Sequence, residues 1–250
     1  MRKILSTTFF RGWAVGAALS VSVGATQAAV INGGFETGDF TGWSTIGIAG
    51  IDTGDLGIGV PGGSHQAFLS TGEDLFGVTG ASDFDIELFL GLTPGSLDSV
   101  SGGDAIEGSA IAQTMTLSAG DILSFDWNFL TNEGSSSFFN DFAFGSLSVL
   151  GADVLGDTFS PLAVSLSPFF DDETGFATES FVIPFSGTFV LGLGVMDSGD
   201  DFMESALVVD NVSIRSDVSE PAGLSLLGIG LAGIGLIRRR RKVCSRAVSA

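Results

Sequence analysis

Several reactive or cross-linking residue types are missing from most of this chain. The 250 residues contain no tyrosine, one cysteine (Cys244) and one histidine (His65), and no lysine occurs between Lys3 and Lys242. Thiol chemistry and lysine Schiff bases are therefore excluded from the central part of the chain, and a Ser-His-Asp triad there would have to use His65. Because no GxSxG motif marks a nucleophile, we interpret His65 as a turn residue beside a strand.

Positive charge is almost absent from the body of the chain. Nine of the ten basic residues lie within the first 11 or the last 13 residues, and only Arg215 lies between them. All 29 acidic residues lie between Glu36 and Glu220, so this segment carries one positive and 29 negative charges, a net charge of −28. Phosphate contacts need lysine and arginine, so this composition excludes a nucleic-acid partner. Such a surface repels anionic polymers and attracts cations.

The centre of the chain consists of short apolar runs separated by glycine, aspartate and serine. Apolar and small or polar residues roughly alternate in the segments 122–130, 142–151, 179–187, 188–196 and 206–214. This period predicts strands, and their number predicts an all-β, antiparallel β-sandwich over residues 29–217. Residues 80–108 differ: DFDIELFLGL predicts one or two helical turns, and the remainder predicts a long loop inserted in the sandwich.

Residues 1–28 have the three parts of a secretory signal peptide. Arg2 and Lys3 precede the apolar stretch WAVGAALSVSVGA, and small residues precede Ala29. We predict a signal helix, passage through the export machinery and cleavage after Ala28. Because Cys244 lies far beyond the body, the exported domain has no disulfide and depends on its core or on a bound metal.

Carboxylates cluster in ways that suit Ca²⁺, a cation that takes six to eight oxygen ligands. The segment 196–211 contains Asp197, Asp200, Asp201, Glu204 and Asp210, and a second cluster lies at 171–173. Neither has EF-hand spacing, so a site would be assembled across the fold; a solvated acidic surface is the alternative. The first and last strands of a sandwich often lie side by side, which would bring Glu36 near Asp210.

The two ends of the body resemble a known family. INGGFETGDFTGWS (31–44) is similar to the opening strand of carbohydrate-binding-module-like, galactose-binding-type jelly rolls, and VVDNV is similar to their closing strand. The resemblance implies a jelly roll with a structural calcium at Glu36 and Asp210. The phrases around Glu133 and Asp141 also resemble secreted bacterial proteins of this kind, which makes these two residues weaker metal candidates. Asp197, Asp200 and Asp201 of the acidic cluster are weaker metal candidates as well. Trp43 and Trp127 are candidates for stacking on a sugar, with a place in the core as the alternative.

An apolar run and a basic cluster follow the body. Residues 222–237 are uncharged and would span about 24 Å as a helix at ~1.5 Å per residue, short for a bilayer of ~30 Å unless arginines snorkel. The basic residues that follow obey the positive-inside rule; they are Arg238, Arg239, Arg240, Arg241 and Lys242. We therefore predict a transmembrane helix rather than a core helix.

The whole segment 218–242 resembles the PEP-CTERM sorting signal of Gram-negative bacteria. The motif residues are Ser219, Glu220, Pro221 and Ala222, with Ser219 where the family has proline. The resemblance implies that an exosortase cuts the transiently membrane-anchored chain near this motif and delivers it to the cell surface or exopolysaccharide matrix. A related signal, read by a rhomboid-like protease, needs a glycine pair that is missing here. Residues 243–250 form a short tail.

The favoured hypothesis is a non-enzymatic, exported surface or matrix protein, stabilised by calcium and able to bind polysaccharide. A secreted glycan hydrolase that uses two carboxylates is the first alternative. The second is a single-pass membrane protein that keeps its tail.

Overall fold

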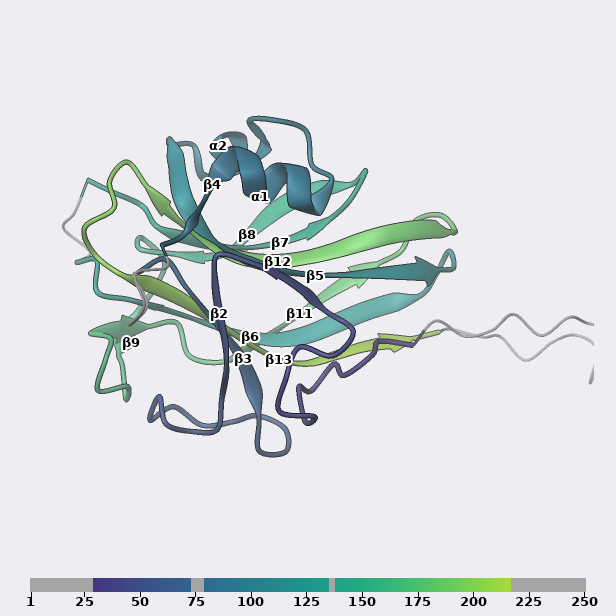
Figure 1. The fold of residues 1–250 in the computed structure, drawn as a ribbon, viewed down its shortest axis with the longest axis horizontal. Coiled ribbons are helices and arrows are strands. Elements are labelled where there is room, and N and C mark those ends of the chain that lie inside the picture. Colours follow the sequence, from purple (N-terminus) through teal and green to yellow (C-terminus); the bar gives the residue numbers. More distant parts are fainter. Residues whose placement is uncertain (1–28, 73–78, 135–137, 217–250) are drawn as a thin grey trace, which may run out of the picture.

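Two antiparallel β-sheets stacked face to face form the body of the protein (Figure 1). The structure is a computed structural model that describes residues 29–72, 79–134 and 138–216. It confirms the predicted all-β antiparallel sandwich. The predicted signal peptide with its cleavage at Ala28, and the predicted sorting signal and transmembrane helix of residues 218–242, lie outside the described residues. Within the described ranges, no helix is long and apolar enough to cross a membrane.

The first sheet has six strands. Their hydrogen-bonded order is β1-β5-β12-β7-β8, and β4 also pairs with β5. The bounds are β1 (Ser44–Ile46), β4 (Ala81–Ser82), β5 (Ala105–Leu117), β7 (Phe142–Leu147), β8 (Gly151–Asp157) and β12 (Gly187–Ser198).

The second sheet has seven strands in the order β2-β3-β13-β6-β10-β9, and β11 also pairs with β6. The bounds are β2 (Ile48–Asp52), β3 (Gln66–Ser70), β6 (Ile122–Thr131), β9 (Ala163–Val164), β10 (Asp172–Glu173), β11 (Ala177–Val182) and β13 (Ser205–Arg215). The chain passes between the two sheets several times, so residues far apart in sequence become neighbours at the sheet faces and ends.

The main core lies between the sheets and follows the two-residue period of the strands. In β6, Leu123, Phe125 and Phe129 belong to the core cluster, whereas Asp126 and Leu130 alternate with them and face outward. Successive strand side chains point to opposite faces, so this alternation places one apolar set inside the sandwich and a second set on the outer face of the sheet. The outer face of the second sheet therefore carries polar groups as well as a smaller apolar cluster.

Two helices cover the outer face of the first sheet (Figure 1). Helix α1 (Asp83–Leu90) begins at the capping hydroxyl of Ser82, and α2 (Ser96–Ser101) follows it. The prediction of one or two helical turns fits α1, but the loop predicted after it is wrong, because α2 forms there. The buried carboxylate of Glu87 accepts hydrogen bonds from the backbone N–H groups of Gly95 and Leu97, both at 2.8 Å. This side chain satisfies donors at the start of α2 that the helix itself leaves free.

The opening segment is not the strand that the resemblance implied. It forms turns, and the first strand starts at Ser44. Asn32 and Phe35 have φ values of 51° and 55°, a left-handed conformation that a strand does not contain. The segment still lies beside the last strand as predicted, because the N–H of Val212 donates to the carbonyl of Gly33 at 2.8 Å.

Candidate functional site

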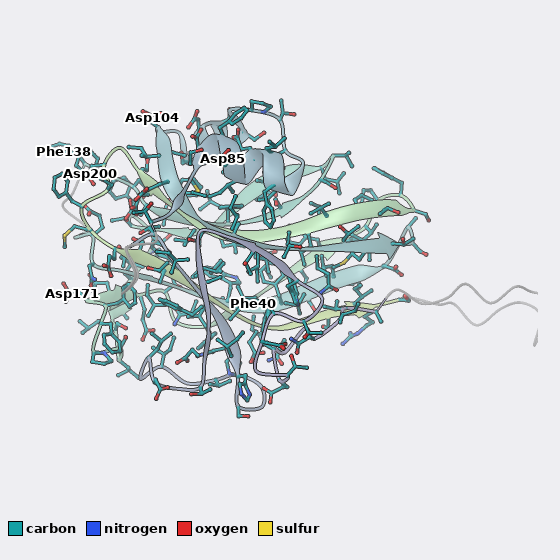
Figure 2. The ribbon with its side chains drawn as sticks, viewed as in Figure 1. Phe40, Asp85, Asp104, Phe138, Asp171 and Asp200 are labelled. Atoms are coloured by element: carbon teal, nitrogen blue, oxygen red, sulfur yellow. The ribbon has the colours of Figure 1, made fainter. Side chains whose placement is uncertain are left out.

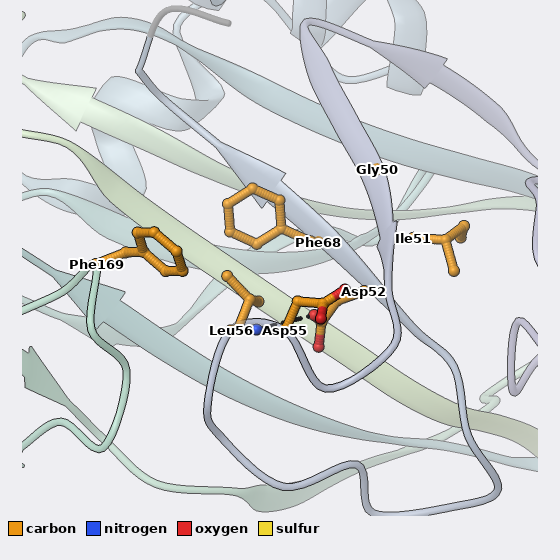
Figure 3. A pocket seen from close by; sticks show the side chains of 7 residues that line it. All are labelled: Gly50, Ile51, Asp52, Asp55, Leu56, Phe68 and Phe169. Carbon is orange, nitrogen blue, oxygen red and sulfur yellow. Dashed lines mark hydrogen bonds between the residues drawn. The ribbon is translucent and has the colours of Figure 1, made fainter. Parts of the chain in front are cut away.

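An open hollow lies on the outer face of the second sheet (Figure 3). It has a volume of about 180 Å³. Strands β2 and β3 form its floor, and the segments that follow β2 and precede β10 form its sides. The lining residues are Gly50, Ile51, Asp52, Asp55, Leu56, Phe68 and Phe169. Figure 3 shows the apolar side chains of Leu56, Phe68 and Phe169 beside the two carboxylates.

The two aspartates of the hollow have different surroundings. Asp52 is 7% exposed, and its two oxygens accept hydrogen bonds from the backbone N–H of Leu56 at 3.1 Å and from the side-chain amide of Gln66 at 2.7 Å. Asp55 is exposed and accepts a bond from the hydroxyl of Thr53 at 3.0 Å. Asp52 therefore holds the wall of the hollow in place, and the carboxylate of Asp55 is exposed at its edge.

Glycine at position 50 keeps the hollow open. Gly50 pairs directly with Phe68 across β2 and β3, so both positions face the same side of the sheet. A Cβ atom at Gly50 would meet no atom within 4 Å. Any side chain at this position would fill space that a ligand could otherwise occupy. The hollow thus combines ring surface, an exposed carboxylate and free volume, the usual ingredients of a small-ligand site.

The structure brings the predicted residue Glu36 to the loop of residues 61–65. Its Oε1 accepts hydrogen bonds from the backbone N–H groups of Ser64 at 2.8 Å and His65 at 2.9 Å. These two donors hold the pKa of Glu36 below its usual value, because they stabilise the charged carboxylate. Nδ1 of His65 lies 3.5 Å from Oε2 of the same carboxylate.

Asp210 reaches the same loop from the outer face of β13. It is 0% exposed and accepts hydrogen bonds from the backbone N–H groups of Gly62 at 2.8 Å and Asn211 at 2.6 Å. Burial raises the pKa of Asp210, and the nearby charges of Asp126 and Glu36 raise it further. The predicted proximity of Glu36 and Asp210 is thus present in the fold, and the loop of residues 61–65 bridges them.

The backbone around this pair requires its glycines. A Cβ atom at Gly33 would lie 2.0 Å from the carbonyl oxygen of Val212, and one at Gly63 would lie 2.2 Å from a carboxylate oxygen of Glu36. The close approach to the backbone of Val212 explains Gly33 in the INGGFE phrase, whereas a Cβ atom at Gly34 would make only an ordinary contact, 3.6 Å from Asp210. Across the described ranges, no three acidic, histidine or cysteine side chains are arranged so that they could hold a metal by themselves. Calcium therefore stays a prediction.

The weaker metal candidates separate into buried and exposed groups. Asp141 and Asp197 are each 2% exposed and Glu133 is 6% exposed. Burial raises the pKa of Asp141 and that of Asp197, and the negative charge of a neighbour, Glu133 for the first and Asp141 for the second, adds to the effect. Asp201 is exposed and Asp200 is partly exposed in the loop between β12 and β13, so neither joins the buried pair.

Both tryptophans predicted as sugar-stacking candidates lie in the core. Trp43 is 8% exposed and Trp127 is 7% exposed, and both belong to the cluster between the sheets. A ring that is covered on both sides has no face for a sugar, which corrects that assignment and leaves the core alternative. Trp127 faces inward because it lies two residues after Phe125, and alternate residues of β6 point to the same side of the sheet.

Comparisons with known proteins find distant structural similarity. No protein-family model matches the chain, and no curated protein is detectably similar to it in sequence. TmCBM61 in complex with β-1,4-galactotriose has 12% identity and a TM-score of 0.39, with 76% of this chain and 99% of that chain covered. CBM27-1 of Caldicellulosiruptor saccharolyticus in complex with mannohexaose has 13% identity and a TM-score of 0.39, with 76% and 98% covered. The K1 cleaved adhesin domain of Lys-gingipain from Porphyromonas gingivalis has 14% identity and a TM-score of 0.39, with 74% and 96% covered.

Sequence reasoning missed the hollow. Its walls come from the segment 50–56, from Phe68 and from Phe169, and Phe169 lies more than a hundred residues after the others, so these residues meet only in the folded protein. The alternation in β3 indicates that Phe68 faces away from its buried neighbours Ala67 and Leu69. A phenylalanine predicted to face away from the core was the sequence signal that could have indicated the hollow.

Proposed function

We propose that this chain is an exported, non-catalytic binding protein that holds a neutral polysaccharide in the hollow on the second sheet. The observation that carries the proposal is the combination of two phenylalanine rings, Phe68 and Phe169, with the exposed carboxylate of Asp55 around an open volume. Sugars present apolar C–H faces and hydroxyl groups, which suit aromatic rings and carboxylate acceptors respectively.

A neutral ligand fits the charge of this protein best. The seven lining residues include two aspartates and no basic side chain. The body carries one positive and 29 negative charges, so an anionic polymer would be repelled before it reached the hollow. We therefore expect neutral glucans, galactans or mannans, rather than uronic-acid or sulfated polymers, to bind.

The two aspartates of the hollow favour binding over hydrolysis. A carboxylate pair for glycoside hydrolysis needs one group to donate a proton and the other to act as base or nucleophile. Asp52 is buried and both of its oxygens accept hydrogen bonds, from Leu56 and Gln66, so this carboxylate is poorly placed to reach a substrate. A single exposed carboxylate, that of Asp55, provides a hydrogen-bond acceptor for a sugar hydroxyl.

A side chain introduced at Gly50 tests the hollow without removing any existing contact. We expect Gly50→Leu to fold normally, since its Cβ would meet no atom within 4 Å, and to fill the hollow. Gly59→Leu is the matched control, because a Cβ at Gly59 also meets nothing and Gly59 does not line the hollow. The full chain and both variants are applied to arrays of neutral and acidic glycans.

The proposal predicts that the unmodified chain and Gly59→Leu bind the same neutral glycan, and that Gly50→Leu loses at least tenfold in affinity, about 1.4 kcal/mol. Binding by Gly50→Leu at unchanged affinity would contradict the assignment of the hollow. The absence of binding to every neutral glycan would contradict the proposed function itself.

Calcium at Glu36 and Asp210 belongs to the same proposal. Two carboxylates that share one loop with Asp126 nearby, and no basic residue except Arg215 in the body, support a cation there. We expect a chelator to lower the melting temperature of the chain, and to lower that of the combined variant Glu36→Gln and Asp210→Asn by less, because one calcium site has been removed from it. If chelator leaves the melting temperature of the original chain unchanged, the proposed calcium site at Glu36 and Asp210 is wrong.

The route of the protein is proposed from its terminal sequences. The predicted signal peptide of residues 1–28 and the tripartite sequence of residues 218–242 support export, transient anchoring in the inner membrane and processing by an exosortase that leaves the protein at the cell surface or in the matrix. Mass spectrometry of the mature protein from its native host tests this route. A mature chain that retains Arg238 to Arg241 would favour the single-pass membrane protein instead.

A further inference from the structure

A second group of buried carboxylates lies at the end of the sandwich opposite to where the described chain begins and ends. Asp141 directly precedes β7, and Asp197 lies near the end of β12, both in the first sheet. Each is 2% exposed. Figure 2 shows Asp104 and Asp200 at this end of the molecule.

The alternation of β12 places Asp197 at this position. The pairing of β12 with β5 is regular from Gly187 to Met196 and shifts register before Ser198, with the extra residue in β5. The ladder between the two strands is therefore interrupted beside Asp197. Val195 belongs to the main core, and Asp197, two residues later, continues on the interior side at the point where the apolar core ends.

Polar groups from both sheets surround the two carboxylates. Asp141 accepts hydrogen bonds from the backbone N–H of Ser198 at 3.1 Å and from the hydroxyl of Ser205, in the second sheet, at 2.7 Å. The hydroxyl of Thr71, which follows β3, donates to the backbone carbonyl of Ser205 at 3.3 Å and lies close enough to Asp197 to lower its pKa. Asp141 and Asp197 lie close enough to shift each other's pKa values. The site therefore spans the gap between the sheets.

One oxygen in this group has no protein partner. Oδ1 of Asp197 is buried and accepts no hydrogen bond from any residue that the structure describes. A buried acceptor without a partner costs free energy, on the order of 1–3 kcal/mol for a neutral group and more for a charged one. The oxygen thus lies among the other carboxyl and hydroxyl groups with an unsatisfied lone pair, which a bound cation would satisfy.

No basic side chain of the described residues can neutralise the pair. The acidic neighbours are Glu133, which acts on Asp141, and Glu107, which acts on Asp197. Arg215 is the only lysine or arginine between Arg11 and Arg238, and it lies at the opposite end of β13 from Ser205. Ten residues along a strand correspond to about 33 Å, well beyond the range of an ion pair.

We propose that Asp141 and Asp197 hold a divalent cation, Ca²⁺ by their chemistry, at a site separate from that of Glu36 and Asp210. All the donors here are oxygens, as a hard cation requires. Because no three acidic side chains of the described residues converge, the remaining ligands would be the hydroxyls of Ser205 and Thr71, backbone carbonyls and water. Ligands drawn from four chain segments suit the irregular coordination of Ca²⁺ better than the strict octahedron of Mg²⁺.

An ion at this position would connect the two sheets. Asp141 and Asp197 belong to the first sheet, whereas Ser205 and Thr71 belong to the ends of strands in the second. With no disulfide available in the body, a cation would supply the cross-link at the end of the sandwich where the apolar core stops. The acidic loop residues at this end, Asp104 and Asp200 among them, would raise the local concentration of cations (Figure 2).

The number of bound ions tests the proposal. The full chain is stripped with chelator, dialysed against about 1 mM CaCl₂, the range of extracellular calcium modules, and analysed by mass spectrometry of the metal. Asp197→Asn keeps the shape of the side chain and removes its charge. The matched control replaces Asp200 and Asp201, exposed or partly exposed acids of the adjoining loop, by asparagine.

We expect Asp197→Asn to bind one ion fewer than the original chain, and the loop control to bind the same number as the original chain. The combined variant Glu36→Gln and Asp210→Asn separates the two sites. If it still binds an ion and loses it on addition of Asp197→Asn, the interior site stands whatever happens at Glu36. An equal number of ions in the original chain and Asp197→Asn would overturn the inference, and would mean that a shared proton neutralises the pair.

A second measurement keeps the test valid if Asp197→Asn does not fold. In the variant Glu36→Gln and Asp210→Asn, where the interior pair is intact, chelator is expected to lower the melting temperature and added CaCl₂ to restore it. A melting temperature that is the same in chelator and in CaCl₂ would overturn the interior site. That result would leave the proposed polysaccharide binding untouched.

Discussion

The outer face of the first sheet is covered by helices, whereas that of the second sheet is partly open. On the first sheet, α1 and α2 cover an apolar surface, and Ile86, Leu97 and Phe144 are all 0% exposed beneath or within this cover. On the second sheet, the outer face carries polar groups such as Asp52 and Asp210, and it stays open at the hollow. The same strand alternation thus produces a sealed face that contributes stability and an open face that can carry ligand chemistry.

The largest loss of stability is expected when a buried side chain is removed from beneath the helices on the first sheet. Phe144→Ala removes a fully buried ring that contacts Phe142 under the helices, with ring centroids 6.2 Å apart. The cavity should lower the free energy of unfolding by about 3–5 kcal/mol, measured by chemical denaturation. Glycan binding by the folded fraction should not change. A cost below about 1 kcal/mol would show that the helices do not seal this face.

A smaller loss is expected from the carboxylate that holds the two helices together. Glu87→Ala leaves the N–H groups of Gly95 and Leu97 without their acceptor in a buried place, and should cost about 2 kcal/mol. Glu87→Gln retains one acceptor oxygen and should cost less. Hydrogen exchange at Gly95 and Leu97 checks the cause, since both amides should exchange faster in Glu87→Ala. Unchanged exchange would contradict the capping role.

The smallest effect on stability is expected in the hollow. Phe169 is 61% exposed, so Phe169→Ala should change the free energy of unfolding by no more than about 0.5 kcal/mol. Its affinity for a neutral glycan should nevertheless fall roughly tenfold or more, as for other aromatic anchors of binding sites. Phe84→Ala, at an exposed phenylalanine of α1, is the control that should change neither quantity. Equal glycan affinity in both variants would contradict the claim that only the open face of the second sheet binds the glycan.

The sandwich was predictable because strand alternation is a local property. In β6, Leu123, Phe125, Trp127 and Phe129 repeat every second residue, and this period specifies which face is buried. The approach of Glu36 to Asp210 was predictable from topology, since the opening segment lies against the last strand. Its conformation was not, because the left-handed residues Asn32 and Phe35 depend on contacts made across the fold.

The remaining features depend on contacts between residues that are distant in sequence. Helix α2 forms because Glu87 reaches its first turn, which composition does not show. The hollow needs Gly50 and Phe169 to meet above Phe68. Among the acids of the segment 196–211, sequence could not separate the buried Asp197 from the exposed Asp201, because the residue at which β12 ends, Ser198, decides it.

Crystallography of the full chain with its best-binding neutral oligosaccharide tests the central claim most directly. The account predicts electron density for a sugar ring in the hollow, against Phe68 or Phe169, with a hydroxyl within hydrogen-bonding distance of Asp55. Density for the sugar at any other place, such as the helix-covered face of the first sheet, would contradict it.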